Sequence, residues 1–70
     1  MVPFAERLKA ARKKKGLKQR EVAEYLQMTP RAYQHYEGGG RRPDYEALVA
    51  LAVYLDVTTD YLLGLSDTPR

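Results

Sequence analysis

The segment QREVAEYLQMTPRAYQHYE, residues 19–37, contributes most to determining the fold. Its first eight residues repeat apolar side chains at helical spacing, which predicts a helix over residues 19–26. Thr29 and Pro30 follow after only two further residues; threonine is favoured as an N-cap, and proline is favoured at the first position of a helix. The sequence therefore predicts a second helix over residues 30–37, joined to the first by a tight turn.

Three further helices are predicted around this pair. Apolar residues at intervals of four and three predict a first helix, which ends before Gly16. Three consecutive glycines end the helix that begins at Pro30, because they cost too much backbone entropy to remain helical. Asp44 is a suitable N-cap for an almost entirely apolar segment, which we expect at the centre of a bundle. The predicted helices cover residues 3–15, 19–26, 30–37, 44–55 and 59–63.

The pattern as a whole indicates an all-α five-helix bundle, with no strand pattern, repeat or low-complexity segment. Seventy residues correspond to one small domain. We expect the folded domain to cover residues 1–65, and we expect residues 66–70 to form a frayed tail.

Composition argues against several classes of site and location. The chain has no cysteine and one histidine, so it offers no disulfide and no zinc site built from those residues, and a reducing cytoplasm is the expected location. The longest apolar run, Ala47–Leu55, has nine residues, whereas a membrane span needs about 20. We therefore expect no metal, no cofactor and no membrane partner, and no set of residues supports an enzyme.

Charge is distributed unevenly along the chain. Residues 1–35 contain nine lysines and arginines against three acids, whereas residues 36–70 contain three basic and six acidic residues. A basic half on a small domain favours a phosphate-bearing partner, because lysine and arginine neutralise phosphates. A solvated surface that only aids solubility explains the same pattern equally well. Charge alone leaves both interpretations open.

The predicted helix pair favours the first interpretation. Two short helices joined by a turn of three or four residues form a helix-turn-helix, which places its second helix in the major groove of DNA. Ala23 supplies the small side chain that the closest approach of the two helices requires. On the outside, Arg31 can bind guanine and Gln34 can bind adenine with two hydrogen bonds each, and the Thr29 methyl group can contact thymine. The exposed face of the second helix thus carries base-reading chemistry.

Motifs along nearly the whole chain support this interpretation. They are Gln19 four residues before Ala23, then Tyr36-Glu37…Gly40…Arg42-Pro43, and finally Tyr61-Leu62-Leu63-Gly64. In this combination the chain resembles the Cro and phage-repressor (XRE-like) helix-turn-helix family. The resemblance implies a five-helix bundle that binds operator DNA sequence-specifically as a dimer.

The resemblance also implies roles for individual residues. The position that contacts backbone phosphate, and sometimes a base, from the start of the second helix is Gln19, with Arg20 beside it. The face that reads the major groove comprises Thr29, Pro30, Arg31, Gln34 and His35. The loop that grips phosphate through backbone N–H groups and side chains comprises Gly40, Arg41 and Arg42. An internal ion pair that ties the first helix to the end of the third is matched by Arg12 and Glu37.

Three positions depart from the family pattern. Gln27 stands where many members have glycine in a left-handed conformation, so either the backbone is strained there or the turn differs slightly. Pro30 has no N–H and no base-reading donor, which concentrates readout on Arg31, Gln34 and His35. Tyr33 replaces an aliphatic residue; it either fills the core, the interpretation we favour, or directs its hydroxyl toward phosphate.

Other features have simpler explanations than chemistry. A lone histidine, His35, is better explained as a surface residue near DNA than as a metal ligand or a catalytic base. Six tyrosines at scattered helical positions fit core and interface packing better than base stacking. The basic run at residues 13–15 is either a solvated helix end or a steering patch for DNA. The glycines at residues 38–40 lack the strand and the Lys-Ser/Thr of a phosphate-binding P-loop.

These observations predict a transcriptional regulator that inserts the helix over residues 30–37 into the major groove of duplex DNA. We expect a repressor that acts as a homodimer on an inverted repeat, with half-sites about 34–36 Å apart. No small-molecule effector is evident. The expected dimer contact comprises Tyr61, Leu62 and Leu65. The alternative is a protein-interaction module, such as an antitoxin-like or adaptor surface, in which the same bundle binds DNA weakly or not at all.

Overall fold

The computed structural model describes residues 3–70, and within this range it contains five helices and no strand. They are α1 (Phe4–Lys14), α2 (Gln19–Tyr25), α3 (Pro30–Gly38), α4 (Tyr45–Leu55) and α5 (Thr59–Leu62). The prediction of an all-α, five-helix fold is confirmed, and no helix end differs from its predicted position by more than one residue. Residues 1 and 2, part of the predicted domain over residues 1–65, lie outside the described residues.

Side-chain caps explain where three of the helices begin. The Thr29 hydroxyl accepts a hydrogen bond from the Ala32 amide at 3.1 Å, and Pro30 occupies the first turn of α3. The Asp44 carboxylate accepts from the amide of residue 47 at 2.8 Å, and the Thr58 hydroxyl accepts from the amide of residue 61 at 3.0 Å. Each cap satisfies an amide that has no partner inside its helix. The predicted starts of α3 and α4 are therefore correct to within one residue.

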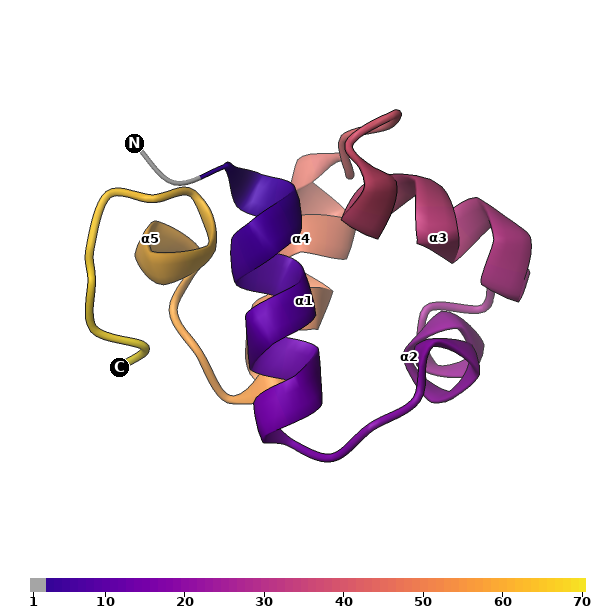
Figure 1. The fold of residues 1–70 in the computed structure, drawn as a ribbon, viewed down its shortest axis with the longest axis horizontal. Helices are drawn as coiled ribbons and strands as arrows, with labels where there is room; N and C mark the ends of the chain where they lie inside the picture. Colours follow the sequence, from indigo (N-terminus) through magenta and orange to yellow (C-terminus); the bar gives the residue numbers. More distant parts are fainter. Residues whose placement is uncertain (1–2) are drawn as a thin grey trace.

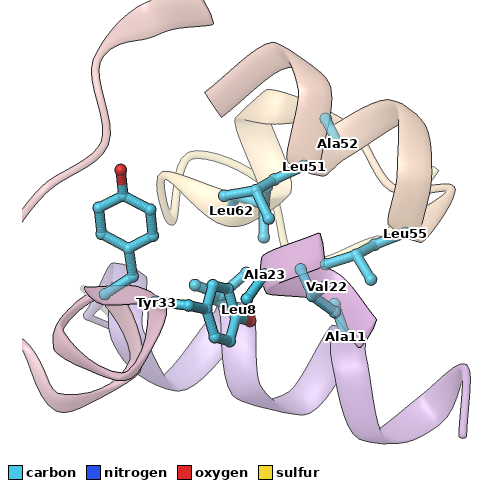
Figure 2. Close-up of a cluster of buried hydrophobic side chains, with 10 residues drawn as sticks. Leu8, Ala11, Val22, Ala23, Tyr33, Leu51, Ala52, Leu55 and Leu62 are labelled. Atoms are coloured by element: carbon cyan, nitrogen blue, oxygen red, sulfur yellow. The ribbon is translucent and has the colours of Figure 1, made fainter. Parts of the chain in front are cut away.

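The helices pack around α1 (Figure 1). α2 and α3 lie on one side of α1, whereas α5 and the C-terminal tail lie on the other side, with α4 behind it in this view. Every helix contributes buried side chains to a shared interior, as Figure 2 shows. The largest fully buried side chains are Tyr33, Leu8, Leu51, Leu55, Leu62 and Val22.

α4 does not lie at the centre of the bundle, contrary to the prediction. Leu51, Ala52 and Leu55 are buried, but Tyr45 is 77% exposed and Val53 is 70% exposed. The rest of the bundle covers only one face of α4, so the other apolar face remains in contact with water. An apolar composition on all sides showed that α4 has a buried face, but it did not show how much of the helix the neighbours cover.

The C-terminal tail is folded back against the bundle, whereas a frayed tail was predicted. The Thr58 amide donates a hydrogen bond to the Pro69 carbonyl at 2.8 Å. Arg7 on α1 contacts the Asp67 carboxylate at 2.8 Å, and Arg70 contacts the Asp56 carboxylate at 3.1 Å. These contacts join residues far apart in the sequence, so local composition could not indicate them. The tail lies against the same side of the bundle as α5 (Figure 1).

Candidate nucleic-acid interface

α2 and α3 are joined by a tight turn that gives the pair its fixed angle. Ala23 is fully buried where the two helices meet, and its carbonyl accepts a hydrogen bond from the Met28 amide at 3.0 Å. Gln27 adopts the left-handed conformation, with φ of 58°. This geometry favours glycine and costs a side-chain-bearing residue about 1 kcal/mol. Of the two outcomes considered for Gln27, the structure shows the strained, left-handed backbone.

The predicted base-reading face of α3 is open to solvent. Its five residues are all exposed, whereas Tyr33 and Tyr36 on the opposite face are buried. The Thr29 hydroxyl accepts the cap hydrogen bond of α3 but keeps its own hydrogen for another acceptor. The structure therefore brings together on one surface Thr29, Pro30, Arg31, Gln34 and His35.

Basic side chains flank this face on both sides. Arg20 on α2 and the loop residues Arg41 and Arg42 are exposed, as is Arg31 on the face itself. Among residues 3–70, none of these four arginines forms an ion pair, so their charges are free for an anionic partner. The Arg41 guanidinium lies 5.9 Å from the centre of the Tyr36 ring. Gly40, in the same loop, is exposed.

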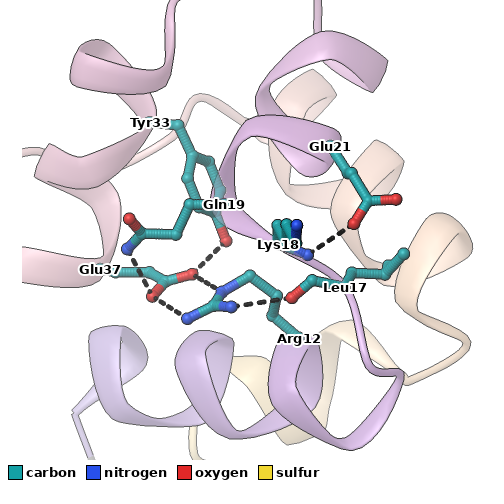
Figure 3. A network of polar contacts seen from close by, with 7 residues as sticks. All are labelled: Arg12, Leu17, Lys18, Gln19, Glu21, Tyr33 and Glu37. Carbon is teal, nitrogen blue, oxygen red and sulfur yellow. Dashed lines mark hydrogen bonds and ion pairs between the residues drawn. The ribbon is translucent and has the colours of Figure 1, made fainter.

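Gln19 differs from its predicted neighbours because its side chain is half-buried and already bonded. Its Nε2 donates to Glu37 Oε1 at 3.1 Å (Figure 3). Glu37 also accepts from Arg12 Nε at 2.6 Å, from Arg12 Nη2 at 3.1 Å and from the Tyr33 hydroxyl at 2.5 Å. The expected pairing of Arg12 with Glu37 is thus present and belongs to a larger network that joins α1, α2 and α3.

The network controls the ionisation of its members. Burial alone would raise the pKa of Glu37, but hydrogen bonds from Arg12, Tyr33 and Gln19 outweigh burial and hold this pKa below its ordinary value. Burial, reinforced by the bond to Glu37, raises the pKa of Tyr33 above its ordinary value. Glu37 is therefore a carboxylate and Tyr33 a neutral hydroxyl donor at neutral pH.

Sequence reasoning identified Tyr33 as a core residue but missed its bond to Glu37. The ring is fully buried, as expected. Its hydroxyl points toward Glu37 within the network, not toward the exposed face of α3 (Figure 3). The available signal was the spacing of four residues on one helix, at which side chains meet.

The predicted dimer contact is only partly available. Leu62 is fully buried, so its inclusion in an exposed contact was wrong. α5 has a single turn, and Leu62 is the residue of that turn that faces the core beside α1 and α4. Tyr61 is half-buried under the Arg7 guanidinium, which lies 4.4 Å from the ring centre, whereas Leu65 is largely exposed.

Other sequence features show no second site in the described part of the chain. Residues 13–15 are exposed at the end of α1, and Lys15 lies 4.0 Å from the Asp56 carboxylate. Within residues 3–70, no three acidic or histidine side chains are grouped as a metal site would require. None of the helices between residues 3 and 70 combines the length and apolar character needed to cross a membrane.

Similarity to known proteins covers most of this architecture. A family model described as helix-turn-helix matches residues 8–62. Among curated relatives, the HTH-type transcriptional regulator YqaE of Bacillus subtilis is 48% identical over 60 residues, which are 86% of this chain and 52% of YqaE. The chain thus spans about half the length of this relative.

Two solved structures have the same arrangement of helices. A transcriptional regulator from Listeria innocua has a TM-score of 0.81 and 37% identity, covering 90% of this chain and 61% of that protein. The P22 c2 repressor, crystallised with a synthetic operator, has a TM-score of 0.82 and 30% identity, covering 90% of this chain and 96% of the repressor chain. With the family match over residues 8–62, these similarities show that the chain belongs to the Cro and phage-repressor-like helix-turn-helix family.

Proposed function

We propose that this chain binds duplex DNA sequence-specifically by placing α3 in the major groove, and that it acts in the cytoplasm as a transcriptional repressor. The observation that carries the proposal is the exposed face of α3, where Arg31, Gln34 and His35 lie in the open and, among residues 3–70, the arginines on and near the face form no ion pair. The solved P22 c2 repressor, which resembles this chain, is in complex with a synthetic operator, and this supports DNA as the partner.

Different residues serve readout and anchoring in this proposal. Arg31 donates two hydrogen bonds to a guanine edge, Gln34 pairs with an adenine edge, and His35 contacts a neighbouring base. Pro30 provides only its ring surface, and the Thr29 methyl group contacts thymine. Phosphates are held by Gln19 and Arg20 from α2 and by Gly40, Arg41 and Arg42 from the loop after α3.

The proposal includes a homodimer on an inverted repeat. Half-sites on one face of DNA are about 34–36 Å apart. The Cα atoms of the described residues span 29 Å along the longest axis, so two copies fit side by side at this spacing. After the exclusion of Leu62, the exposed Leu65 and the half-buried Tyr61 remain as the proposed contact.

Selection of bound duplexes from a random-sequence pool, at low and at moderate salt, tests the proposal. An enriched inverted repeat that is retained at moderate salt is the expected result. Salt-sensitive retention without enrichment would mean that the arginines hold phosphate without base readout. Failure to retain DNA at either salt would contradict the proposal and favour the protein-interaction module.

A further inference from the structure

Gln19 occupies an unusual position because its side chain belongs both to the proposed DNA surface and to the buried polar network. It is half-buried, at the first position of α2. Its amide nitrogen carries two hydrogens, and one of them is used in the 3.1 Å bond to Glu37 Oε1. No hydrogen bond among the described residues uses the second hydrogen. The orientation of this second N–H therefore depends on where Glu37 is held.

Glu37 is held by donors on both of its oxygens. Arg12 Nε and the Tyr33 hydroxyl donate to Oε2, while Arg12 Nη2 and Gln19 Nε2 donate to Oε1 (Figure 3). The Glu37 side chain is only 3% exposed, so water does not replace a donor that is lost. Because the Tyr33 ring is fully buried, its hydroxyl is a rigid donor. Removing it leaves Oε2 with the Arg12 Nε donor alone, so the carboxylate to which Gln19 is bonded is held less firmly.

The network also removes an electrostatic obstacle. A buried carboxylate beside the start of α2 would repel a phosphate group. Arg12 forms two hydrogen bonds to Glu37 and carries the opposite charge, and it donates in addition to the Leu17 carbonyl at 2.8 Å. The pair is neutral as a unit, so an anionic acceptor can approach the free N–H of Gln19.

We propose that Tyr33 and Glu37 are positioning residues for DNA binding, which hold the Gln19 amide so that its second N–H donates to a backbone phosphate oxygen. This inference rests on the proposed function. It adds that the contact of Gln19 with phosphate depends on the buried hydroxyl of Tyr33. A phosphate contact is independent of base sequence. It is therefore measurable on any duplex, before an operator has been identified.

The experiment measures the affinity of the full 70-residue chain for a fluorescent duplex of random sequence at several salt concentrations. The variants are Y33F, Q19A and the double variant, with Y36F as the matched control. Tyr36 is a second buried tyrosine on α3, and its ring meets that of Tyr33 edge-on at 6.1 Å, but its hydroxyl does not bond to Glu37. Phenylalanine at this position keeps the ring beside Arg41. Thermal unfolding of each variant ensures that binding is measured well below its midpoint.

We expect Q19A to weaken binding about tenfold and Y33F about threefold, since a hydrogen bond to a charged acceptor is lost in the first and misaligned in the second. The double variant should bind as weakly as Q19A, while Y36F should bind like the unmodified chain. The dependence of affinity on salt should not change, because Gln19 is neutral and releases no counterion. Y33F should also lower stability in the Q19A background, because the Tyr33–Glu37 hydrogen bond is still present when residue 19 is alanine.

Three results would overturn the inference while the proposed function stands. They are additive effects of Y33F and Q19A on affinity, no effect of Q19A, and a loss in Y36F equal to that in Y33F. Failure of the unmodified chain to bind the duplex would overturn the proposed function and this inference with it.

Discussion

Single arginines on the proposed surface differ in what they can recognise. Arg31 lies on the exposed face of α3 that is proposed to enter the major groove, whereas Arg41 lies in the following loop near the Tyr36 ring. A contact to a base edge distinguishes sequences, and a contact to phosphate does not. Both arginines are exposed and charged, so these properties do not distinguish base recognition from phosphate binding. Their positions, on the helix or in the loop, do distinguish the two roles.

Arg31→Ala tests base readout. We expect it to lower affinity for the selected site by about 1–3 kcal/mol and to relax specificity at one base pair of each half-site. The control, Lys14→Ala, removes an exposed charge at the end of α1 and should weaken binding to all sequences by the same small factor. Titration of both variants against the selected site and single-base variants of it measures the difference. Equal losses on every site for both variants would argue against readout by Arg31.

The ionisation of Glu37 predicts a pH dependence of stability. The pKa of Glu37 is lower in the folded chain than its ordinary value of about 4.3. The contribution of its carboxylate to the free energy of unfolding is therefore fully present above that value. The contribution is lost as the pH falls through the lower, folded-state pKa. The Glu37→Gln variant has no carboxylate at this position, so it has no such contribution to lose. We therefore expect the difference in unfolding free energy between the unmodified chain and this variant to shrink as the pH falls below about 4, as measured by urea denaturation. A constant difference from pH 7 to pH 2 would contradict the assignment.

Helices were predictable where local signals define them and less so where packing decides. Thr29, Asp44 and Thr58 cap helices as their residue types and positions indicate. The burial of α4 was overestimated because a helix that is apolar on all sides gives no sign of which face its neighbours cover. Leu62 is buried while Leu63 and Leu65 are exposed, and three leucines in four positions give no sequence signal for that difference.

The turn between α2 and α3 yields a prediction at the level of the element. Gln27→Gly should raise the unfolding free energy by about 0.5–1 kcal/mol, because glycine relieves the left-handed backbone at a smaller entropic cost. Gln34→Gly, the same change in the interior of α3, should lower it by about 1 kcal/mol. Chemical denaturation measures both. Destabilisation by Gln27→Gly would mean that the Gln27 side chain stabilises the turn by more than the strain costs.

At the scale of the whole molecule, the exposed face of α3 could be predicted from sequence because it lies on a short, well-capped helix. The polar network could be identified only in part. The resemblance indicated Arg12 with Glu37, but the bonds from Gln19 and Tyr33 depend on how α2 and α3 pack. The contacts of the tail join residues up to 60 positions apart, and no local pattern indicates such pairs.

Leu65→Asp tests the proposed dimer. We expect it to shift sedimentation toward the monomer and to remove cooperativity on an inverted repeat, because it places a charge in an apolar contact. Val53→Asp changes an equally exposed apolar residue on α4 and should leave both properties unchanged. If Val53→Asp alone disrupts the dimer, the contact lies on α4 and not near α5.

The folded tail also sets a direction for whatever is joined to it. Bonds from Thr58 to Pro69 and from Arg70 to Asp56 fix the last residues against the side of α1 that carries α5. In Figure 1 the C-terminus and α3 lie at opposite ends of the longest axis. A second domain or a reporter protein fused after residue 70 would therefore leave the bundle away from α3, the helix proposed to read DNA. Such fusions can be large without blocking access to the groove, which makes this end the natural attachment point for a tether or label.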